Sequence, residues 1–552
     1  MLRSVIGQGA RNESGAVAST VALSLFGLIA VGGLAVDYAR MAALDTELQQ
    51  AADQAALAAA SQLNGQSGAC SRAVIAARDL LENKTKFGND GGGYDVTIPN
   101  QTANSGCGTG GDKIKFYSAY TNNSSNTVTT DPLAAKFVSV TVNTRKAVYA
   151  LTPIMALFNS TMGGTAVAGL GSAICKVPPV MICNPQETGG NTSFDAAGLI
   201  GKGLKLVSVG NGGSWAPGNF GYLNTGGGSN GAPGLREALG WTAAPGDCLP
   251  QTGVDTKPGA TVSVTDALNT RFDIYDSNQS CPSGGNCPAS INSVKDLLRP
   301  NNANGNNACR IHNSGWQEAS PDNKLYLPNS TNALTPSTLT PDVMGHPRDM
   351  CHAADSGAAN YCSGPIGTGA WDRDTYFRTN YGWNTSQWQA NVQTGSSPIA
   401  APASATRYQV YSWEIANRGS TIGGVVILST RSVGSLRDHD APVCSNIQTP
   451  SYGTGTVPGA TTVDRRRISV AVVNCTANSV NGASTNVPVA KWVDVFLVEP
   501  SLNRGAASSG THARSGTNAG DVYVEVIGET ASGAAGQTAG QVIRRDKPYL
   551  IE

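Results

Sequence analysis

The sequence predicts an α+β protein: a single long N-terminal transmembrane helix followed by a β-rich, loop-rich, disulfide-containing ectodomain. Three observations predict this fold class. An uncharged run extends from Ser14 to Val36, a helical repeat of apolar residues follows it, and the remaining chain combines 12 cysteines and 66 glycines with only 14% charged residues. A usual chain has about 25% charged residues.

Residues 16–36 are predicted to cross a membrane. These residues are mostly small or aliphatic, and at 1.5 Å per residue they cover a hydrocarbon layer of about 30 Å. A cleavable signal peptide is the alternative, but its apolar core has only about 7 to 15 residues and ends at a cleavage site. Here the apolar run continues into more helix, which favours an anchor.

The charges that flank this segment predict its orientation. Arg3, Arg11 and the amino terminus precede it, whereas Arg40 is the only cation in the following stretch. Four carboxylates lie in that stretch: Asp37, Asp45, Glu47 and Asp53. The positive-inside rule then places residues 1–15 in the cytoplasm and everything after Val36 outside the bacterial inner membrane, in the periplasm or at the surface.

The helix is expected to continue outside the membrane as residues 37–65. Apolar residues recur there at spacings of three and four, and neither glycine nor proline occurs before Gly65. The repeat consists of Met41, Leu44, Leu48, Ala51, Ala55 and Ala58. One helix over residues 16–63 follows. Its narrow apolar stripe fits packing on its own ectodomain and bundling with copies or partners in an assembly equally well.

Charge balance and cysteine usage narrow the functional class. Lysine plus arginine equals aspartate plus glutamate at 38 each, so no basic field exists to hold nucleic acid. The cysteines are even in number and form no CxxC pair, which favours structural disulfides in an oxidising compartment. Pairs such as Cys351 with Cys362 or Cys444 with Cys475 are plausible, although the spacing leaves the connectivity open.

A chain of 552 residues predicts more than one domain beyond the helix. Residues 66–190 read as an α+β membrane-proximal domain with a helix at 72–83, strands at 94–98, 114–117 and 137–142, and an apolar run at 150–158. Residues 191–406 read as a loop-rich region that contains cysteines. Residues 407–552 read as a β-rich C-terminal domain with strands at 409–415, 424–429, 468–473, 492–498 and 522–527.

The N-terminal 65 residues resemble the TadE/TadG-like Flp pilus-assembly family. The resemblance rests on a short basic start, on 33–40 (GLAVDYAR) and on 48–60 (LQQAADQAALAAA). Stretches 175–185 (CKVPPVMICNP) and 215–221 (WAPGNFG) look like the longer TadG-like members. The resemblance implies a non-enzymatic part in tight-adherence pilus assembly. Its partners would be inner-membrane lipid and, through the N-terminal helix, other pilus-assembly or pilin-like proteins.

Two family features are missing from this sequence. Some TadG-like proteins carry a von Willebrand factor A domain with a DxSxS metal site, and no DxSxS occurs here. Pilin-like members are cut by a prepilin peptidase with glutamate at the fifth position after the cut. Gly15 is suitably placed, but Thr20 occupies that position. We therefore expect an uncut anchor without a carried-over metal site.

Three groups of side chains are candidates for metal-binding or recognition sites. His346, Asp349 and His352 would bind a metal if they converged with Asp355, but Cys351 within the run more simply marks a disulfide. Asp372 and Asp374 fit a Ca²⁺ loop, but Arg373 between them favours a salt-bridged turn. Six aromatic residues fit either a recognition platform or, more simply, a core: Trp371, Tyr376, Phe377, Tyr381, Trp383 and Trp388.

The sequence thus predicts no catalytic, cofactor-binding or metal-binding residues and no enzyme. The leading hypothesis is a membrane-anchored component of Flp/Tad pilus assembly or its envelope scaffold. A surface adhesin or binding module on the same anchor is the alternative.

Overall fold

The computed structural model describes residues 13–63, 68–79, 85–88, 95–98, 107, 113–121, 126–132, 134–147, 160–175, 179–208, 215–224, 231–241, 249–250, 253–257, 264–276, 279–318, 341–354, 361–444, 464–503, 517–530 and 543–551. These residues belong to two compact units. Unit 1 comprises residues 1–172 and 546–552, and unit 2 comprises residues 173–545. The sequence predicted boundaries near residues 190 and 406, whereas the structure divides the chain between residues 172 and 173 and between residues 545 and 546.

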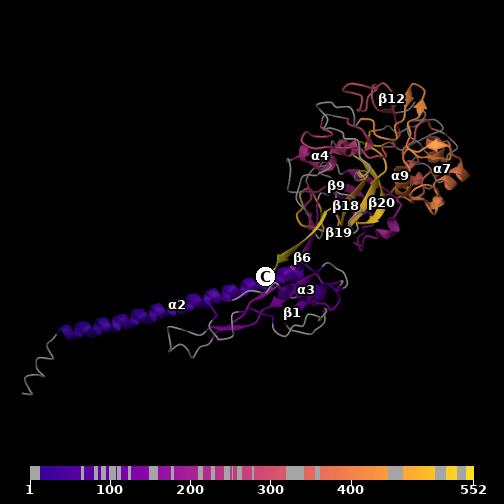
Figure 1. The fold of residues 1–552 in the computed structure, drawn as a ribbon. Helices are drawn as coiled ribbons and strands as arrows, with labels where there is room; N and C mark the ends of the chain where they lie inside the picture. The colour runs from indigo at the N-terminus through magenta and orange to yellow at the C-terminus, as the bar shows by residue number, and fades with distance from the viewer. Residues whose placement is uncertain are drawn as a thin grey trace, which may run out of the picture. The chain divides into compact units, whose positions relative to one another are not determined.

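Unit 1 is built on the predicted long helix. Helix α2 covers Glu13–Ala60 without interruption, and Figure 1 shows its first part extending clear of the rest of the unit. Between residues 17 and 36 every residue except Gly33 is exposed. The second helix is also confirmed, as α3 (Ala69–Asp79); residues 80–83 of the predicted range lie outside the described residues.

The second part of α2 packs on its own unit. Leu44, Leu48 and Ala55 are fully buried in a cluster that also contains Val138 and Val140 of the sheet. In unit 1 the sheet consists of β1 (Ile114–Ala119), β2 (Thr127–Val128), β3 (Phe137–Thr141), the greater part of β6 (Thr165–Cys175) and the end of β21 (Ile543–Leu550). Strand β10 (Leu249–Pro250), which pairs with Ala173 and Ile174 at the end of β6, belongs to unit 2. The sequence left open whether the apolar stripe packs on its own ectodomain or on partner helices. The structure shows it packed on its own unit.

A separate hairpin joins β4 (Arg145–Ala147) to β5 (Ser160–Met162), with Lys146 opposite Thr161. Strands β1 and β3 confirm the predictions at 114–117 and 137–142. Residues 95–98 form no strand, although Val96 and Ile98 are buried. Tyr94 and the apolar run 150–158 lie outside the described residues.

Unit 2 is organised around a closed six-stranded barrel. Its strands are β7 (Val180–Cys183), β8 (Gly203–Ser208), β9 (Asn219–Tyr222), β18 (Arg467–Val473), β19 (Val487–Leu497) and β20 (Val522–Glu529). The order β18-β7-β9-β8-β20 is closed by β19, which pairs with both β20 and β18. Only β18 with β7 and β8 with β9 are parallel among these pairs.

The barrel interior is a packed core. Leu206, Phe220, Val470, Val495 and Val524 line a residual space of about 10 Å³, too small for a ligand. Strand β7 comes from the predicted membrane-proximal domain, β8 and β9 from the region predicted to be loop-rich, and β18, β19 and β20 from the predicted C-terminal domain. Segments of all three predicted regions therefore form one folded unit. The strands predicted at 468–473, 492–498 and 522–527 are confirmed as β18, β19 and β20.

Helices and short strands cover the barrel (Figure 1). The helices are α4 (Ala232–Gly240), α5 (Thr265–Asn269), α6 (Met350–Ala353), α7 (Arg373–Tyr381), α8 (Thr385–Asn391) and α9 (Arg407–Ala416), with 3-10 turns η2 (Ala197–Leu199), η4 (Thr270–Phe272) and η6 (Pro402–Ser404). The short strands are β11 (Gly253–Val254), β12 (Leu297–Pro300), β13 (Gln317–Glu318), β14 (Thr421–Ile422), β15 (Val425–Val426), β16 (Ser432–Val433) and β17 (Leu436–Arg437).

The strand predicted at 409–415 is wrong, because this segment is helix α9. Thr406 and Gln409 form a capping box at its start: the Thr406 hydroxyl accepts from the Gln409 backbone, and the Gln409 side chain accepts from the Thr406 backbone. This pairing satisfies two N–H groups that a helix start otherwise leaves free. Of the strand predicted at 424–429, only Val425 and Val426 form a strand, β15.

Five disulfides join described cysteines: Cys70–Cys107, Cys183–Cys475, Cys281–Cys287, Cys309–Cys444 and Cys351–Cys362. The suggested pairing of Cys351 with Cys362 is confirmed. The suggested pairing of Cys444 with Cys475 is wrong, since β7 and β18 run side by side and bring Cys183 to Cys475.

Candidate functional site

The exposed first part of α2 is the first candidate site. Leu23, Phe26 and Leu28 are exposed by 72%, 68% and 71% of their surfaces. Large apolar side chains exposed together on one helix indicate contact with lipid or protein. Among the described residues, α2 is the one helix long and apolar enough to cross a membrane. Its position at the start of unit 1 agrees with the predicted anchor.

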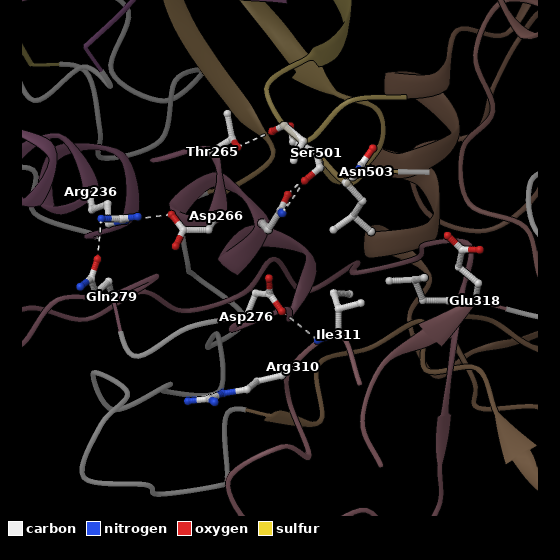
Figure 2. Close-up of a pocket in the computed structure, with 14 residues that line it drawn as sticks. Arg236, Thr265, Asp266, Asp276, Gln279, Arg310, Ile311, Glu318, Ser501 and Asn503 are labelled. Carbon is white, nitrogen blue, oxygen red and sulfur yellow. Dashed lines mark hydrogen bonds and ion pairs between the residues drawn. The ribbon is translucent and has the colours of Figure 1, made fainter. Parts of the chain in front are cut away.

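A cleft of about 790 Å³ in unit 2 is the second candidate site. Figure 2 shows its wall assembled from separate segments of the chain. Arg236 of α4 bonds to Asp266 of α5 at 3.0 Å and to Gln279 at 2.8 Å, while Asp276 accepts a bond from the Ile311 backbone at 3.1 Å. Thus carboxylates, a guanidinium and amides face the cleft together.

The cleft combines apolar and polar groups. Leu297, Ile311 and Leu502 supply apolar surface, and Asn503 is exposed at the rim. Neither histidine nor cysteine is among the described residues that line it. This mixed surface suits a polar partner that both donates and accepts hydrogen bonds.

The three residues weighed as metal ligands, His346, Asp349 and His352, do not converge. The Asp349 carboxylate forms an ion pair with Arg407. The His352 ring bonds to the Tyr523 hydroxyl at 2.9 Å and to the Gly364 carbonyl at 3.0 Å. His346 instead lies 3.6 Å from Glu414. Asp355 lies outside the described residues.

Cys351, His352 and Cys362 come within 4.8 Å of one another through their possible ligand atoms. The two sulfurs form a disulfide, and a metal ion binds the thiolate form of cysteine. The cysteine in this run therefore marks a disulfide, as the simpler reading of the sequence expected.

Asp349 belongs to a buried network that the sequence did not indicate. Arg407, the first residue of α9, bonds to Asp349 and, at 2.8 Å, to Glu525 of β20. All three side chains are fully buried. Burial raises the pKa of Glu525, and the Arg407 guanidinium opposes that rise. No local sequence pattern signals this set, because its members are 58 and 118 residues apart.

Glu414 forms a second buried network on α9. Its carboxylate accepts bonds from the Tyr376 hydroxyl at 2.7 Å, the Tyr381 hydroxyl at 2.8 Å and the Asn292 amide at 2.6 Å. Burial raises the pKa of Glu414, and these three bonds act against the rise. The Arg407 network attaches α9 to barrel strand β20, and the Glu414 network joins α9 to α7. Both lie away from solvent, which is typical of structural groups.

The carboxylates of Asp372 and Asp374, the candidates for a Ca²⁺ loop, bond to groups at different places in the fold. Asp372 caps helix α7 by accepting from the Thr375 backbone and hydroxyl. Asp374 accepts instead from the Trp388 indole at 2.7 Å, and Arg373 donates to the Ala405 carbonyl at 2.8 Å. The two carboxylates thus serve different partners.

The six aromatic residues of this region form a core, as the simpler reading expected. Each is no more than 5% exposed. Phe377 stacks on Trp388 with ring centroids 4.8 Å apart, and Tyr381 stacks on Trp383 at the same distance. Buried rings are not available as a recognition platform.

Comparison with known proteins places the N-terminal helix in a family. Residues 15–62 match the family described as putative Flp pilus-assembly TadE/G-like. The match coincides with α2 and confirms the resemblance seen in its sequence. It ends before α3, and unit 2 lies outside it. No curated protein and no solved structure matches the chain.

Proposed function

We propose that this protein is a non-enzymatic, membrane-anchored component of Flp/Tad pilus assembly or of its envelope scaffold. The observation that carries the proposal is the coincidence of two features in α2. The TadE/G-like match covers residues 15–62, and the same helix exposes its apolar residues from 17 to 36. In this proposal α2 anchors the chain in the inner membrane and meets pilus-assembly or pilin-like proteins there, while the folded units act in the periplasm or at the surface.

The packing of α2 limits where partners bind. Leu44, Leu48 and Ala55 are covered by unit 1 itself, so a partner helix is expected to meet the stretch before residue 37. A helix fixed to its own folded unit in this way behaves as an anchor with a rigid continuation. This packing supports an uncut anchor over a pilin that enters a filament. Thr20, which stands where a prepilin peptidase site after Gly15 would have glutamate, supports the same conclusion.

Deletion of the gene followed by measurement of pilus production tests the assembly role. We expect filaments to be lost and to return when the full chain is supplied from a plasmid. Normal filaments together with lost surface attachment would exclude assembly and favour the adhesin.

The adhesin alternative is supported by the cleft of about 790 Å³. Asn503→Trp places a large side chain at its rim, and Asn481→Trp, at another exposed position of unit 2, is the matched control. If the protein is an adhesin, Asn503→Trp reduces attachment and leaves filaments intact, whereas Asn481→Trp changes neither. An assembly component without a ligand in this cleft shows no difference between the two variants.

Orientation is tested by thiol labelling of spheroplasts after reduction. If both units lie outside the inner membrane, the reduced cysteines are labelled without permeabilisation. Labelling confined to permeabilised cells would reverse the proposed orientation. Mass spectrometry of the intact chain examines processing, since a start at Met1 or Leu2 excludes a cut after Gly15.

A further inference from the structure

A short segment of unit 1 crosses α2 just beyond its predicted membrane-spanning part. This segment, residues 85–88, is called the strap. Arg40 Nε donates to the Phe87 carbonyl at 3.3 Å, and the Glu47 carboxylate accepts from the Lys86 and Phe87 backbone N–H groups at 3.1 to 3.4 Å. At 1.5 Å per residue, Arg40 and Glu47 lie about 6 and 16 Å beyond Val36.

The strap is held on its other side as well. Arg145 of β4 donates to the Thr85 hydroxyl at 3.5 Å. A Cβ added at Gly88 would lie 2.7 Å from that hydroxyl and 3.1 Å from Arg145 Nη2. Both Thr85 and Arg145 are buried. The backbone of the strap is thus fixed between α2 and the β4–β5 hairpin.

The side chains of Lys86 and Phe87, in contrast, are exposed. Phe87 is 41% exposed, and Tyr38 of α2 is 71% exposed. Of the carboxylates on this stretch of α2, Asp37 is buried and Glu47 is bound to the strap backbone, while Asp45 is exposed. Tyr38 and Arg40 thus lie just beyond the predicted span, and the strap adds Phe87 and Lys86 between the levels of Arg40 and Glu47.

We infer that Tyr38, Arg40, Lys86 and Phe87 form a surface that contacts the phospholipid headgroup layer where α2 leaves the membrane. This inference rests on the proposed anchor. Headgroups extend only some 5 to 8 Å beyond the hydrocarbon on each side, which is the depth of Arg40 and of the Phe87 carbonyl bound to it. A tyrosine ring with its hydroxyl and cations that face lipid phosphates favour this layer, and a phenylalanine ring adds apolar surface at its inner boundary. The strap thus fixes the depth and rotation of unit 1 at the membrane.

Photo-crosslinking of the full chain in phosphatidylglycerol/phosphatidylcholine vesicles tests this inference. p-Benzoylphenylalanine is introduced at Phe87, at Leu28 within the predicted span, or at Tyr549. The last is an aromatic residue of unit 1 with a similar exposure of 45%. The Tyr549 ring lies next to Gly169 of β6. Gly164, five residues before Gly169, is the residue that lies against the Leu48 backbone of α2. We expect lipid adducts at positions 28 and 87 and only background at 549.

The outcomes separate this inference from the proposed anchor. Adducts at position 28 with none at 87 overturn the lipid contact and leave the anchor intact. Absence of adducts at both positions overturns both, and adducts to a second protein chain at 87 also overturn the lipid contact. In the chain that carries p-benzoylphenylalanine at position 87, the additional substitution Lys86→Glu should lower the adduct yield in phosphatidylglycerol vesicles, because it replaces a cation with an anion next to anionic lipid. Lys115→Glu, at an exposed position of β1, should not.

Discussion

Arg407 is a side chain of unit 2 whose loss is expected to have a large energetic effect. It faces two carboxylates, Asp349 and Glu525, and all three groups are fully buried. Loss of the guanidinium would leave two buried acids without their cation. Breaking a buried ion pair from one side typically costs about 3 to 5 kcal/mol, because the remaining charge stays desolvated.

We therefore expect Arg407→Met to lower the free energy of unfolding of unit 2 by about 3 to 5 kcal/mol. Tryptophan fluorescence during urea unfolding measures it, since all eight tryptophans lie within residues 173–545. The control is Lys491→Met, which removes an ion pair with Glu529 in which the side chains are 41% and 57% exposed. Such a pair is worth about 1 kcal/mol or less. Equal effects of the two substitutions would contradict the role assigned to Arg407.

His352 predicts a pH dependence of stability. Burial lowers its pKa to about 4, whereas the unfolded chain takes up a proton near pH 6.5. Between these values the unfolded state binds more protons, so stability is lost as pH falls from about 6.5 to about 4. One such group contributes a slope of up to about 1.4 kcal/mol per pH unit.

In His352→Gln this contribution should disappear. Urea unfolding at several pH values between 4.5 and 7 measures it as a smaller slope. His312→Gln, at an exposed position, is the control. A residual slope is expected because burial also lowers the pKa of His439 to about 4. An unchanged slope in His352→Gln would show that the His352 ring is protonated in the folded state.

The contact between α2 and the β5–β6 turn explains how the second part of the helix is held. A Cβ added at Gly164 would lie 2.2 Å from the Leu48 carbonyl oxygen and 2.9 Å from the Gln49 backbone nitrogen. Backbone atoms of a helix cannot move aside as a side chain can. The bare glycine therefore allows the sheet to approach α2 closely and bury Leu48.

Gly164→Ala is expected to destabilise unit 1 by about 1 to 3 kcal/mol through overpacking. The adjacent Gly163→Ala is the matched control, since its Cβ would meet the Thr144 methyl group at 3.2 Å. Amide hydrogen exchange of β3 and of residues 44–60 reports the loss, because unit 1 contains no tryptophan. Equal exchange rates in the two variants would mean that Gly164 does not approach the Leu48 backbone this closely.

Helix α9 shows where reasoning at the level of elements fails. Tyr411, Trp413 and Ile415 alternate with polar residues in its sequence, a pattern that favours a strand. Tertiary contacts decide otherwise, since Val410, Trp413 and Glu414 lie on one helical face and are all fully buried. The capping box of Thr406 and Gln409 was the local signal that could have identified the helix.

At the scale of the whole molecule, the Cys183–Cys475 disulfide links residues 292 apart at the ends of β7 and β18. The Cys281–Cys287 disulfide closes a separation of only 6. A crosslink restricts the unfolded chain more when the loop that it closes is longer.

We expect the double variant Cys183→Ser/Cys475→Ser to lose more unfolding free energy than Cys281→Ser/Cys287→Ser. The difference is about 3 kcal/mol from loop length alone. Urea unfolding followed by tryptophan fluorescence measures both. Equal losses would indicate that the unfolded chain is already restricted by the Cys309–Cys444 link inside the longer loop.

The sequence by itself determined the parts of this protein that depend on local composition. An uncharged stretch followed by a repeat at spacings of three and four was enough to define α2 and its family. Alternating β-branched residues were enough for β18 and β20, and cysteine usage was enough for the presence of disulfides. These features follow from periodicity and hydrophobicity along the chain.

Only the tertiary structure decided which segments meet. It placed the apolar stripe of α2 on its own unit, joined β7, β8 and β9 with β18, β19 and β20 in one barrel, and paired Cys183 with Cys475. It also distributed His346, Asp349 and His352 among separate partners, so they do not form the metal site that their spacing in the sequence would allow. The physical reason is that pairing partners separated by tens to hundreds of residues are selected by the packing of the whole chain, and no local pattern records that choice.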